Sequence, residues 1–460
     1  MDYDLVVLGG GAGGLSAARA AARRRASVAM VQEGRVGGEC TFAGCVPSKA
    51  LIEAALRGAT FKEAMAAAHR AIEAIAETES PEVLRREGVQ LIPGRGRFCS
   101  PRSLEVDGRR LSAAGYVIAT GAAPAVPPIE GLADIAYLTN ENLWDLDSLP
   151  ASLAILGGGA IGVEMAQAIS NLGSRVSLIE GQDRLLPHEE PEASAVLVQL
   201  FHDQGIEVSL GQQVTRIEPS GEPAAPPGAA RLHLGGGATL EADAVLVSVG
   251  RRPNTADIGL GEAGVRTDAH GFVVTNDHLA TTAKGIWAAG DVSGKLQFTH
   301  AADEMGRMAA ANALSRLRRR SFRSRSIPWV TFTSPEIARV GVTEAEGAEL
   351  GARVAWLPMA ELDRAVIAGE TAGFVKLIVG RRPLLRNLAG GQVLGATIMA
   401  ARGGEMIAEV ALAMRTKMFP ARLALTTHAY PTWSTAVQKA AAQLFIEIDG
   451  RRWRPAVAPT

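Results

Sequence analysis

The chain has 460 residues, of which 47% are hydrophobic and 21% charged, and its formal net charge is −1 at pH 7. A chain of this length is too long for one hydrophobic core, so we expect several domains. The nearly neutral charge excludes a general attraction to nucleic acid or to an anionic membrane surface. The sequence shows no apolar run long enough to cross a bilayer and no secretory leader, so we expect a cytoplasmic protein.

Two stretches of the sequence share one order of elements. Each begins with an apolar strand (4–8 and 153–156), passes through a glycine-rich turn into a helix, and ends in a second strand (27–31 and 175–179) followed by an acidic residue. The two turns read GGGAGG and GGGAIG. A repeated strand, turn, helix and strand predicts two βαβ units.

Each turn contains the pattern G-x-G-x-x-G, which is typical of dinucleotide-binding folds. The first glycine permits the tight turn, the second lets the backbone approach a pyrophosphate, and the third lets helix and strand pack closely. A carboxylate after the second strand accepts hydrogen bonds from ribose hydroxyls and repels a 2′-phosphate, so the second site should prefer NAD to NADP. The residues are Gly9, Gly11, Gly14 and Glu33 in the first repeat, and Gly157, Gly159, Gly162 and Glu180 in the second.

The cysteines are few, and two of them lie close together. Residues 37–51 read GGECTFAGCVPSKAL, in which four residues separate Cys40 from Cys45. At the start of a helix this spacing can bring the sulfurs within bonding reach, and the helix N-terminus lowers the thiol pKa. We therefore predict a redox-active disulfide, with two buried structural thiols as the alternative. Cys99 falls in a predicted strand, where we expect an inert core thiol.

The remaining segments predict the domain layout. Residues 49–80 are rich in Ala and lack Pro, which favours a helix. Residues 216–240 alternate Pro and Gly clusters with a short strand, which indicates hairpins and loops at a domain surface. We interpret the basic run 315–325 as a solvated linker rather than a binding patch. From Trp329 onward, strands alternate with two helical segments, which predicts a separate α+β domain.

The pattern around the cysteine pair, GGxCxxxGCVPSK, resembles the class I pyridine nucleotide-disulfide oxidoreductases, or flavoprotein disulfide reductases. Further segments match in the order of that family: YVIATGAAP (116–124), VLVSVGRRPN (245–254), GIWAAGDV (285–292) and TFTSPEIARVGVTEAE (331–346). The resemblance implies an α/β fold with two Rossmann-like FAD/NAD(P)-binding domains and a C-terminal α+β dimerisation domain. The implied domains are 1–148 (FAD, first part), 149–272 (NAD), 273–328 (FAD and central, second part) and 329–460 (dimerisation).

The resemblance also implies roles for single residues. Cys45 would be the sulfur next to the flavin and Cys40 the sulfur that exchanges with substrate. Lys49 would lie near the reactive nitrogen of the flavin and pair with Glu164, which stabilises a reduced, anionic flavin. Asp291 would bind the ribityl chain. Further implied contacts are Gly38, Thr120, Gly121 and His300 for FAD and Gly250 for NAD, and no metal site is expected.

The C-terminal motif departs from the family pattern. Disulfide-reducing members carry His-x-His-Pro-Thr-x-Ser-Glu, whose second His, oriented by the Glu, is the acid–base group across the dimer interface. Residues 428–435 read HAYPTWST, so Tyr430 stands at the catalytic His position and Thr435 at the Glu position. Tyr is no base at neutral pH, because its ordinary pKa is about 10. By resemblance we expect a cis peptide before Pro431.

The sequence therefore predicts a homodimeric, FAD-dependent oxidoreductase that couples NAD(H) to a disulfide or dithiol. The first expectation is an enzyme that resembles dihydrolipoamide dehydrogenase with an altered acid–base site. It would act on a small thiol or disulfide substrate, for which a lipoyl-carrying protein is one candidate. The alternative is reduction of a metal or small electrophile, as in mercuric reductase, although we expect neither the C-terminal cysteine pair nor the N-terminal metal-binding domain of that enzyme. A non-catalytic flavoprotein subunit of a complex is the third possibility, and the intact cysteines argue against it.

Overall fold

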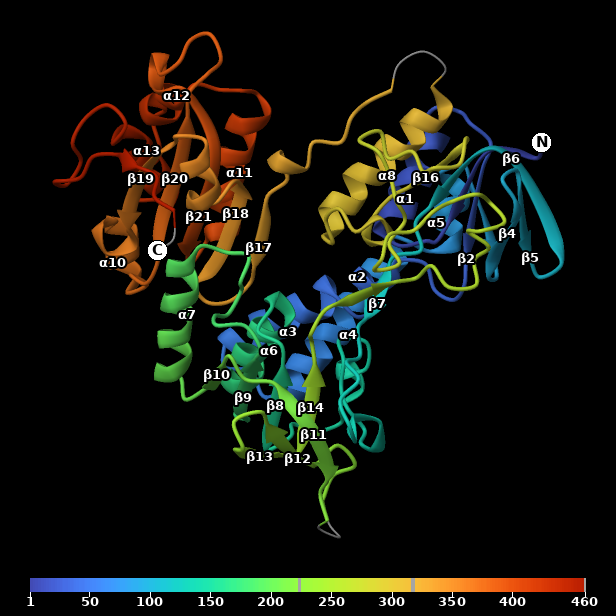
Figure 1. Cartoon of the computed structure of the whole chain (residues 1–460), viewed down its shortest axis with the longest axis horizontal. Coiled ribbons are helices and arrows are strands. Elements are labelled where there is room, and N and C mark those ends of the chain that lie inside the picture. The colour runs from blue at the N-terminus through green and yellow to red at the C-terminus, as the bar shows by residue number, and fades with distance from the viewer. Residues whose placement is uncertain (222–224, 316–318, 459–460) are drawn as a thin grey trace. The chain divides into compact units, whose positions relative to one another are not determined.

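The computed structural model describes residues 1–221, 225–315 and 319–458, and the chain divides into two compact units. Unit 1 consists of Met1–Pro150, Gly221–Ala229 and Ala244–Ser324, and unit 2 of Ala151–Ser220, Ala230–Asp243 and Arg325–Thr460. Each unit contains one of the two predicted repeats, whose helices are α1 and α6 in Figure 1. No helix in the described ranges is long and apolar enough to span a membrane.

Unit 1 is built on a sheet of mainly parallel strands. Its strand order is β3-β2-β1-β6, β16 also pairs with β6 in parallel, and the antiparallel strands β5 and β4 continue from the first half of β6. Val6 and Val117 at its centre are fully buried, as strands of parallel sheets usually are. The strands are β1 (Tyr3–Leu8), β2 (Val28–Gln32), β3 (Val89–Pro93), β4 (Gly96–Ser100), β5 (Ser103–Val106), β6 (Arg109–Ile118) and β16 (Ile286–Ala288); outside this sheet, β7 (Ala122–Pro124) pairs with β15 (Arg251–Pro253), which follows β14 (Ala244–Val247).

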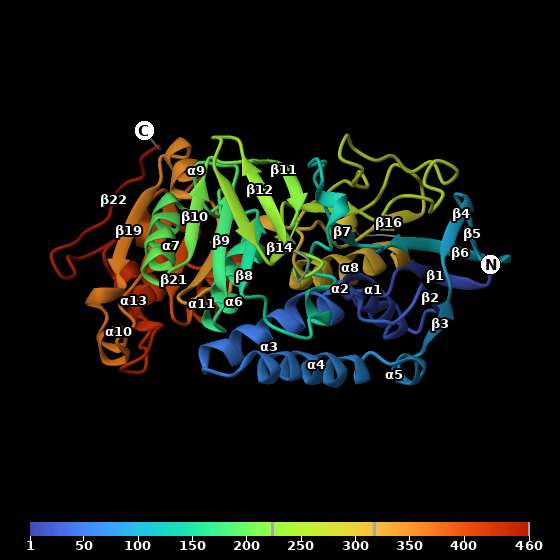
Figure 2. The same cartoon turned by 90° about the horizontal axis from the view of Figure 1, so that it is seen from below.

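The helices of unit 1 pack closely. α1 and α8 approach so near that a Cβ on Gly306 would lie 2.0 Å from the carbonyl oxygen of Gly13. α3 and α4 lie side by side (Figure 2). The helix predicted over 49–80 is therefore interrupted, because Thr60 begins α4 with a capping box formed with Glu63. The helices are α1 (Ala12–Ala22), α2 (Gly38–Phe42), α3 (Cys45–Leu56), α4 (Phe61–Glu77), α5 (Pro81–Arg86) and α8 (Thr299–Leu314).

Two expectations for unit 1 need comment. Cys99 lies on β4 as predicted, but its side chain is exposed, so the prediction of a core thiol is wrong. Neighbouring side chains of a strand point to opposite faces, and Phe98 takes the inward face at 1% exposure. Within the basic run 315–325, residues 316–318 lie outside the described residues. Arg320, beyond them, donates its backbone N–H to Asn312 of α8 at 2.8 Å.

Unit 2 contains the second repeat and the C-terminal sheet. In the repeat, β10, β9 and β8 are neighbouring parallel strands, and three antiparallel strands follow over much of the predicted hairpin region. Residues 222–224 of that region lie outside the described residues. The elements are β8 (Ser152–Leu156), α6 (Ala160–Asn171), β9 (Arg175–Glu180), α7 (Pro191–Asp203), β10 (Glu207–Leu210), β11 (Val214–Pro219), β12 (Ala230–Leu234) and β13 (Thr239–Ala242).

The C-terminal part of unit 2 is an antiparallel sheet with helices, as the alternation of strands and helices predicted. Its strand order is β17-β18-β21-β20-β19-β22, and its apolar core includes the fully buried Val375 and Ala396. The strands are β17 (Trp329–Thr331), β18 (Glu336–Gly341), β19 (Arg353–Pro358), β20 (Phe374–Gly380), β21 (Gln392–Ala400) and β22 (Arg454–Pro455). The helices are α9 (Glu344–Glu349), α10 (Asp363–Ala368), α11 (Gly403–Arg415), α12 (Pro420–Leu425) and α13 (Thr435–Ala442).

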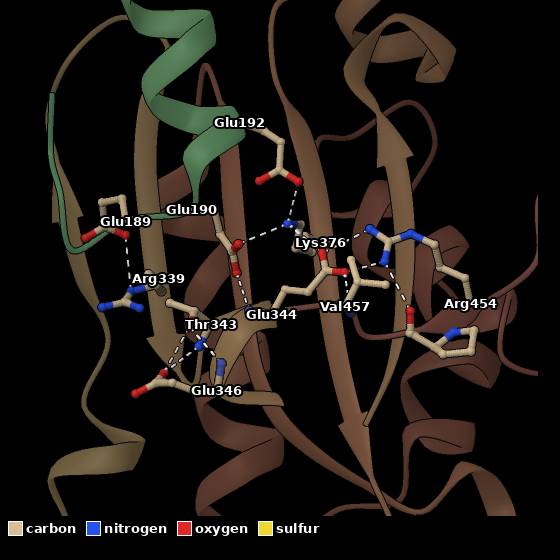
Figure 3. A network of polar contacts seen from close by, with 11 residues as sticks. Glu189, Glu190, Glu192, Arg339, Thr343, Glu344, Glu346, Lys376, Arg454 and Val457 are labelled. Atoms are coloured by element: carbon tan, nitrogen blue, oxygen red, sulfur yellow. Dashed lines mark hydrogen bonds and ion pairs between the residues drawn. The ribbon is translucent and has the colours of Figure 1, made fainter. Parts of the chain in front are cut away.

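A buried network of charges connects the start of α7 with this sheet (Figure 3). Lys376 of β20 is 1% exposed, and its Nζ lies 3.0 Å from Glu190 Oε2, 2.7 Å from Glu192 Oε1 and 2.9 Å from Glu344 Oε2. Arg454 of β22 also pairs with Glu344, through Nη2 and Oε2 at 2.9 Å. Segment 189–192, which follows the second repeat, is thereby bound to β20 through Lys376 and to α9 through the N–H of Glu344, which donates to Glu190 at 2.7 Å.

Candidate functional site

The first glycine turn has the shape that a pyrophosphate needs. Gly9 has φ +104°, and a Cβ there would lie 2.3 Å from the carbonyl oxygen of Ala119. A Cβ on Gly14 would lie 1.9 Å from the carbonyl oxygen of Gly9. Gly11, the N-cap of α1, is open instead: the nearest atom to a Cβ there is Gly38 Cα at 3.7 Å. Two glycines are therefore required by packing, and the third leaves room for a phosphate at the start of α1.

Gln32 is the last residue of β2, as Glu180 is of β9 in the second repeat. Gln32 Oε1 accepts the N–H of Gly10 at 2.6 Å, and in the second repeat Glu180 Oε2 accepts the N–H of Gly158 at the same distance. The donor and the acceptor are 22 residues apart in each repeat, from Gly10 to Gln32 and from Gly158 to Glu180. Gln32 and Glu180 therefore occupy equivalent positions in the two repeats. Glu33, which we predicted at this position, lies one residue further on with an exposed side chain.

The second glycine turn repeats this geometry in unit 2. Gly157 has φ +106°, and no atom lies within 4 Å of a Cβ placed on Gly159, the N-cap of α6. Glu180 is held in place by two backbone donors, since its Oε1 also accepts the N–H of Gln182 at 2.7 Å. The residues present fit a dinucleotide with an anionic side chain at its ribose.

The cysteine pair lies on two short, consecutive helices. Cys40 belongs to α2, and Cys45 is the first residue of α3; neither is in a disulfide bond among the described residues. The Sγ of Cys45 lies 3.4 Å from the hydroxyl of Thr299, the first residue of α8. The hydrogen bond with Cys45 and burial raise the pKa of Cys40. The lowered thiol pKa that we expected from a helix N-terminus therefore does not hold for Cys40.

A partly buried ion-pair cluster adjoins the cysteine loop in unit 1. Arg251 Nη1 donates to Glu39 Oε1 at 2.6 Å, Nη2 donates to Glu39 Oε2, and Nε lies 3.3 Å from Asp291 Oδ2. Burial raises the pKa of Asp291 to about 6; Arg251 opposes this shift, while Glu39 and Cys45 add to it. The contribution from Cys45 places Asp291 within electrostatic reach of the predicted flavin-proximal sulfur.

Other predicted site residues fall into both units. The hydroxyl of Thr120 donates to the carbonyl of Asn254 at 2.7 Å, and Gly121 and Gly250 both have positive φ. His300 follows Thr299 on α8. Lys49 lies on α3 in unit 1, whereas Glu164 lies on α6 in unit 2, where its carboxylate accepts the N–H of Phe332 at 2.8 Å. The pairing of Lys49 with Glu164 therefore stays a prediction.

The C-terminal motif offers no imidazole at the expected position. The peptide between Tyr430 and Pro431 is cis, as predicted. Tyr430 is 72% exposed, and its hydroxyl donates to Asp363 Oδ2 at 2.9 Å, which raises the pKa of Tyr430. His428 Nδ1 lies 2.9 Å from the carbonyl of Thr426, and its Nε2 lies 3.0 Å from Glu409. Both nitrogens of His428 therefore face acceptors.

The described geometry agrees with comparisons to known proteins. Residues 3–306 match the family described as pyridine nucleotide-disulphide oxidoreductase, and residues 327–441 match its dimerisation domain. The chain belongs to this family. The mercuric reductase of Streptomyces lividans is 37% identical over 470 residues, which cover 96% of each chain. The dihydrolipoyl dehydrogenase of Thermus scotoductus is 32% identical over 473 residues, which cover 96% of this chain and 97% of that protein.

A solved structure is similar over its whole length. The Cu(II) complex of the HOCl-induced flavoprotein disulfide reductase RclA from Escherichia coli has 30% identity and a TM-score of 0.86, and the match covers 96% of this chain and 99% of that chain. Membership of the pyridine nucleotide-disulphide oxidoreductases confirms the predicted fold class, the use of FAD and NAD(P)H, and an enzyme of the flavoprotein disulfide oxidoreductase class. The named relatives carry the names of different activities, so membership of the family does not define the substrate.

Three residues of the candidate site were not among the residues predicted from the sequence. Gln32 could have been found by aligning the two repeats, because Gln32 follows Gly10 by as many residues as Glu180 follows Gly158. Glu39 and Arg251 each lie inside a quoted motif. Their pairing joins segments more than two hundred residues apart, and no local pattern indicates it.

Proposed function

We propose that this oxidoreductase is a homodimer that passes electrons from NADH through FAD and the Cys40–Cys45 pair to a thiophilic metal ion or another small electrophile. The observation that carries the proposal is the hydrogen bond from Tyr430 to Asp363. A dithiol or disulfide substrate needs protons moved to and from sulfur, whereas a soft metal ion binds thiolates directly. A tyrosine whose proton is donated to a carboxylate, with its pKa raised, is a poor group for that proton transfer.

His428 does not replace the missing base in this proposal. Its two ring nitrogens face the carbonyl of Thr426 and the carboxylate of Glu409, and its side chain is only 8% exposed. A base needs a lone pair directed at the proton it accepts. The imidazole of His428 is therefore occupied within its own unit.

The cofactor preferences follow from the glycine turns. FAD, when bound, relays two electrons between the nicotinamide and the cysteine pair. The turn at Gly11 would receive its pyrophosphate, and Gln32 would hydrogen-bond its ribose. Glu180 is anionic and fixed by two N–H groups, so it would repel the 2′-phosphate of NADP and favour NAD.

A second candidate is the dihydrolipoamide dehydrogenase-like reaction with an altered acid–base site. It is favoured by the dihydrolipoyl dehydrogenase relatives, which match across more than nine-tenths of this chain. In the described ranges no group of three or more His, Cys, Asp or Glu side chains is arranged to hold a metal ion. A metal substrate would therefore depend on the cysteine pair itself.

Steady-state turnover with NADH separates the two candidates. The substrates are thiol-complexed mercuric ion, cupric ion, lipoamide and glutathione disulfide, with Cys40→Ser as the control for reactions that bypass the pair. We expect lipoamide turnover to be at least about a hundredfold slower than flavin reduction by NADH, which is the usual loss without general acid–base help. Metal-ion turnover should approach the rate of flavin reduction. Lipoamide turnover as fast as flavin reduction would refute the proposal.

A further inference from the structure

The loop that carries both cysteines is fixed from outside by side chains of two other segments. On one side, Asn140 Nδ2 donates to Glu39 Oε1 at 2.7 Å, and Glu39 directly precedes Cys40. Between the cysteines, the carbonyl of Ala43 accepts the indole N–H of Trp144 at 3.2 Å. On the other side, Arg251 contacts the same Glu39 with two nitrogens. These contacts leave the loop little freedom to move.

Arg251 is shared between this loop and the segment that begins at Asp291. Its side chain is 17% exposed, compared with 20% for Glu39 and 19% for Asp291. The contact to Asp291 at 3.3 Å is an ion pair without hydrogen-bond geometry, because Arg251 Nε has no hydrogen-bond partner among the described residues. One guanidinium therefore pairs with two carboxylates. Its interaction with Asp291 is purely Coulombic, whereas its interaction with Glu39 also includes hydrogen bonds.

The charges of Arg251, Glu39 and Asp291 affect the cysteine pair, because reduction of the pair creates negative charge. A carboxylate near a thiolate disfavours the thiolate, and the effect is strong where water is largely excluded. Glu39 is the residue next to Cys40, and Asp291 lies within electrostatic reach of Cys45. Without Arg251, both carboxylates would lose the guanidinium that balances their charge close to the reduced pair.

We propose that Arg251 is a positioning residue for the reduced Cys40–Cys45 pair. By pairing with Glu39 and Asp291, it holds the cysteine loop against the segment after β16 and removes the repulsion that would otherwise disfavour the thiolate. The inference rests on the proposed function in one respect, namely that Cys40 and Cys45 are the redox pair. It goes beyond that function because it assigns the tuning of the pair to residues outside the cysteine motif.

The test uses the FAD-loaded protein and three variants: Arg251→Met, Glu39→Gln and the double variant. Bound FAD per chain is measured first, so that every later signal is expressed per FAD. Thiolate-to-flavin charge-transfer absorbance is then read after anaerobic two-electron reduction, and the dithiol–disulfide equilibrium is measured against a reference thiol couple. The control is Arg97→Met, which breaks an exposed Arg–Glu pair in the same unit.

Arg251→Met should lower the charge-transfer absorbance at least threefold and shift the equilibrium about tenfold toward the disulfide, which is about 30 mV for a two-electron couple. The double variant should return both values to within about twofold of the wild type, because losing Arg251 and Glu39 together leaves the net charge of the cluster unchanged. Glu39→Gln alone should shift the equilibrium the opposite way, toward the dithiol. This opposite sign tests the inference even if Arg251→Met fails to fold.

Three results would decide against the inference. An Arg251→Met variant that matches the wild type would refute it, and so would a double variant no better than Arg251→Met, which would indicate a purely steric role. An Arg97→Met control that behaves like Arg251→Met would show that the effect is not local. A wild-type protein without any charge-transfer band would instead refute the redox assignment of Cys40 and Cys45, and this inference with it.

Discussion

Replacing Lys376 by Met should destabilise unit 2 strongly. Lys376 is 1% exposed and is the cation that faces Glu190, which is 2% exposed, and Glu344, which is 6% exposed. Removing one partner of a buried ion pair leaves an uncompensated buried charge and costs about 3–5 kcal/mol of unfolding free energy. Glu344 keeps Arg454, and Glu192 is 41% exposed, so the cost should come mainly from Glu190. For a unit of this size the loss corresponds to a Tm lower by roughly 6–20 °C.

The assay is guanidinium unfolding of the FAD-loaded protein, followed by tryptophan fluorescence and far-UV circular dichroism. Lys439→Met is the matched control, because its ion pair with Asp449 is partly exposed and should change the unfolding free energy by less than about 1 kcal/mol. The double variant Lys376→Met with Glu190→Gln should recover part of the loss. A Lys376→Met variant within about 1 kcal/mol of the wild type would refute the reasoning.

The same network should affect stability in acid. Burial acts to raise the pKa of Glu344, but hydrogen bonds from Arg454 and Lys376 outweigh it and hold the pKa at about 2. A depressed folded-state pKa contributes stability that is fully present above the ordinary value of 4.5 and is lost as the pH falls toward 2. In Lys376→Met this loss between pH 4.5 and 2 should be smaller, which unfolding curves at several pH values would measure.

Three further predictions concern the catalytic cycle. Glu180 should give at least a tenfold preference for NADH over NADPH in kcat/KM, and equal use of the two nucleotides would contradict this. Cys45→Ser should abolish the charge-transfer band while Cys40→Ser should keep one, as titration with NADH would show; exchanged behaviour would reverse the assigned roles. Tyr430→His with Thr435→Glu should speed lipoamide turnover by about 10²-fold without changing flavin reduction by NADH; no gain would mean that the pocket suits a substrate that needs no base.

Local patterns in the sequence were enough to predict local geometry. The glycine turns and their flanking strands each depend on a few adjacent residues, and all are present. The cis peptide before Pro431, which we expected from the family resemblance, is also present. Two errors were also local. The interruption before α4 is marked by Thr60 and Glu63, the usual spacing of a capping box. Alternation along β4 places Cys99 opposite the buried Phe98.

Contacts between distant segments could not be predicted in this way. Asp363 lies at the start of α10, far in sequence from Tyr430, and no motif joins the two. The same holds for Arg251 with Glu39. Such pairs are set by how the elements pack, and a single sequence holds no local trace of that packing. The candidate site was therefore predictable as a set of motifs, whereas the partners that adjust each motif required the structure.

The close approach of Gly13 and Gly306 gives the crossing of α1 and α8 a role beyond packing. α1 starts at the turn for the pyrophosphate, and α8 starts at Thr299, which contacts Cys45. The crossing of the two helices would thus set the distance between the regions that hold the two ends of an extended cofactor. A methyl group on Gly306 would force the helices apart. Such a change would disturb phosphate binding and the surroundings of the thiol together, although it touches neither.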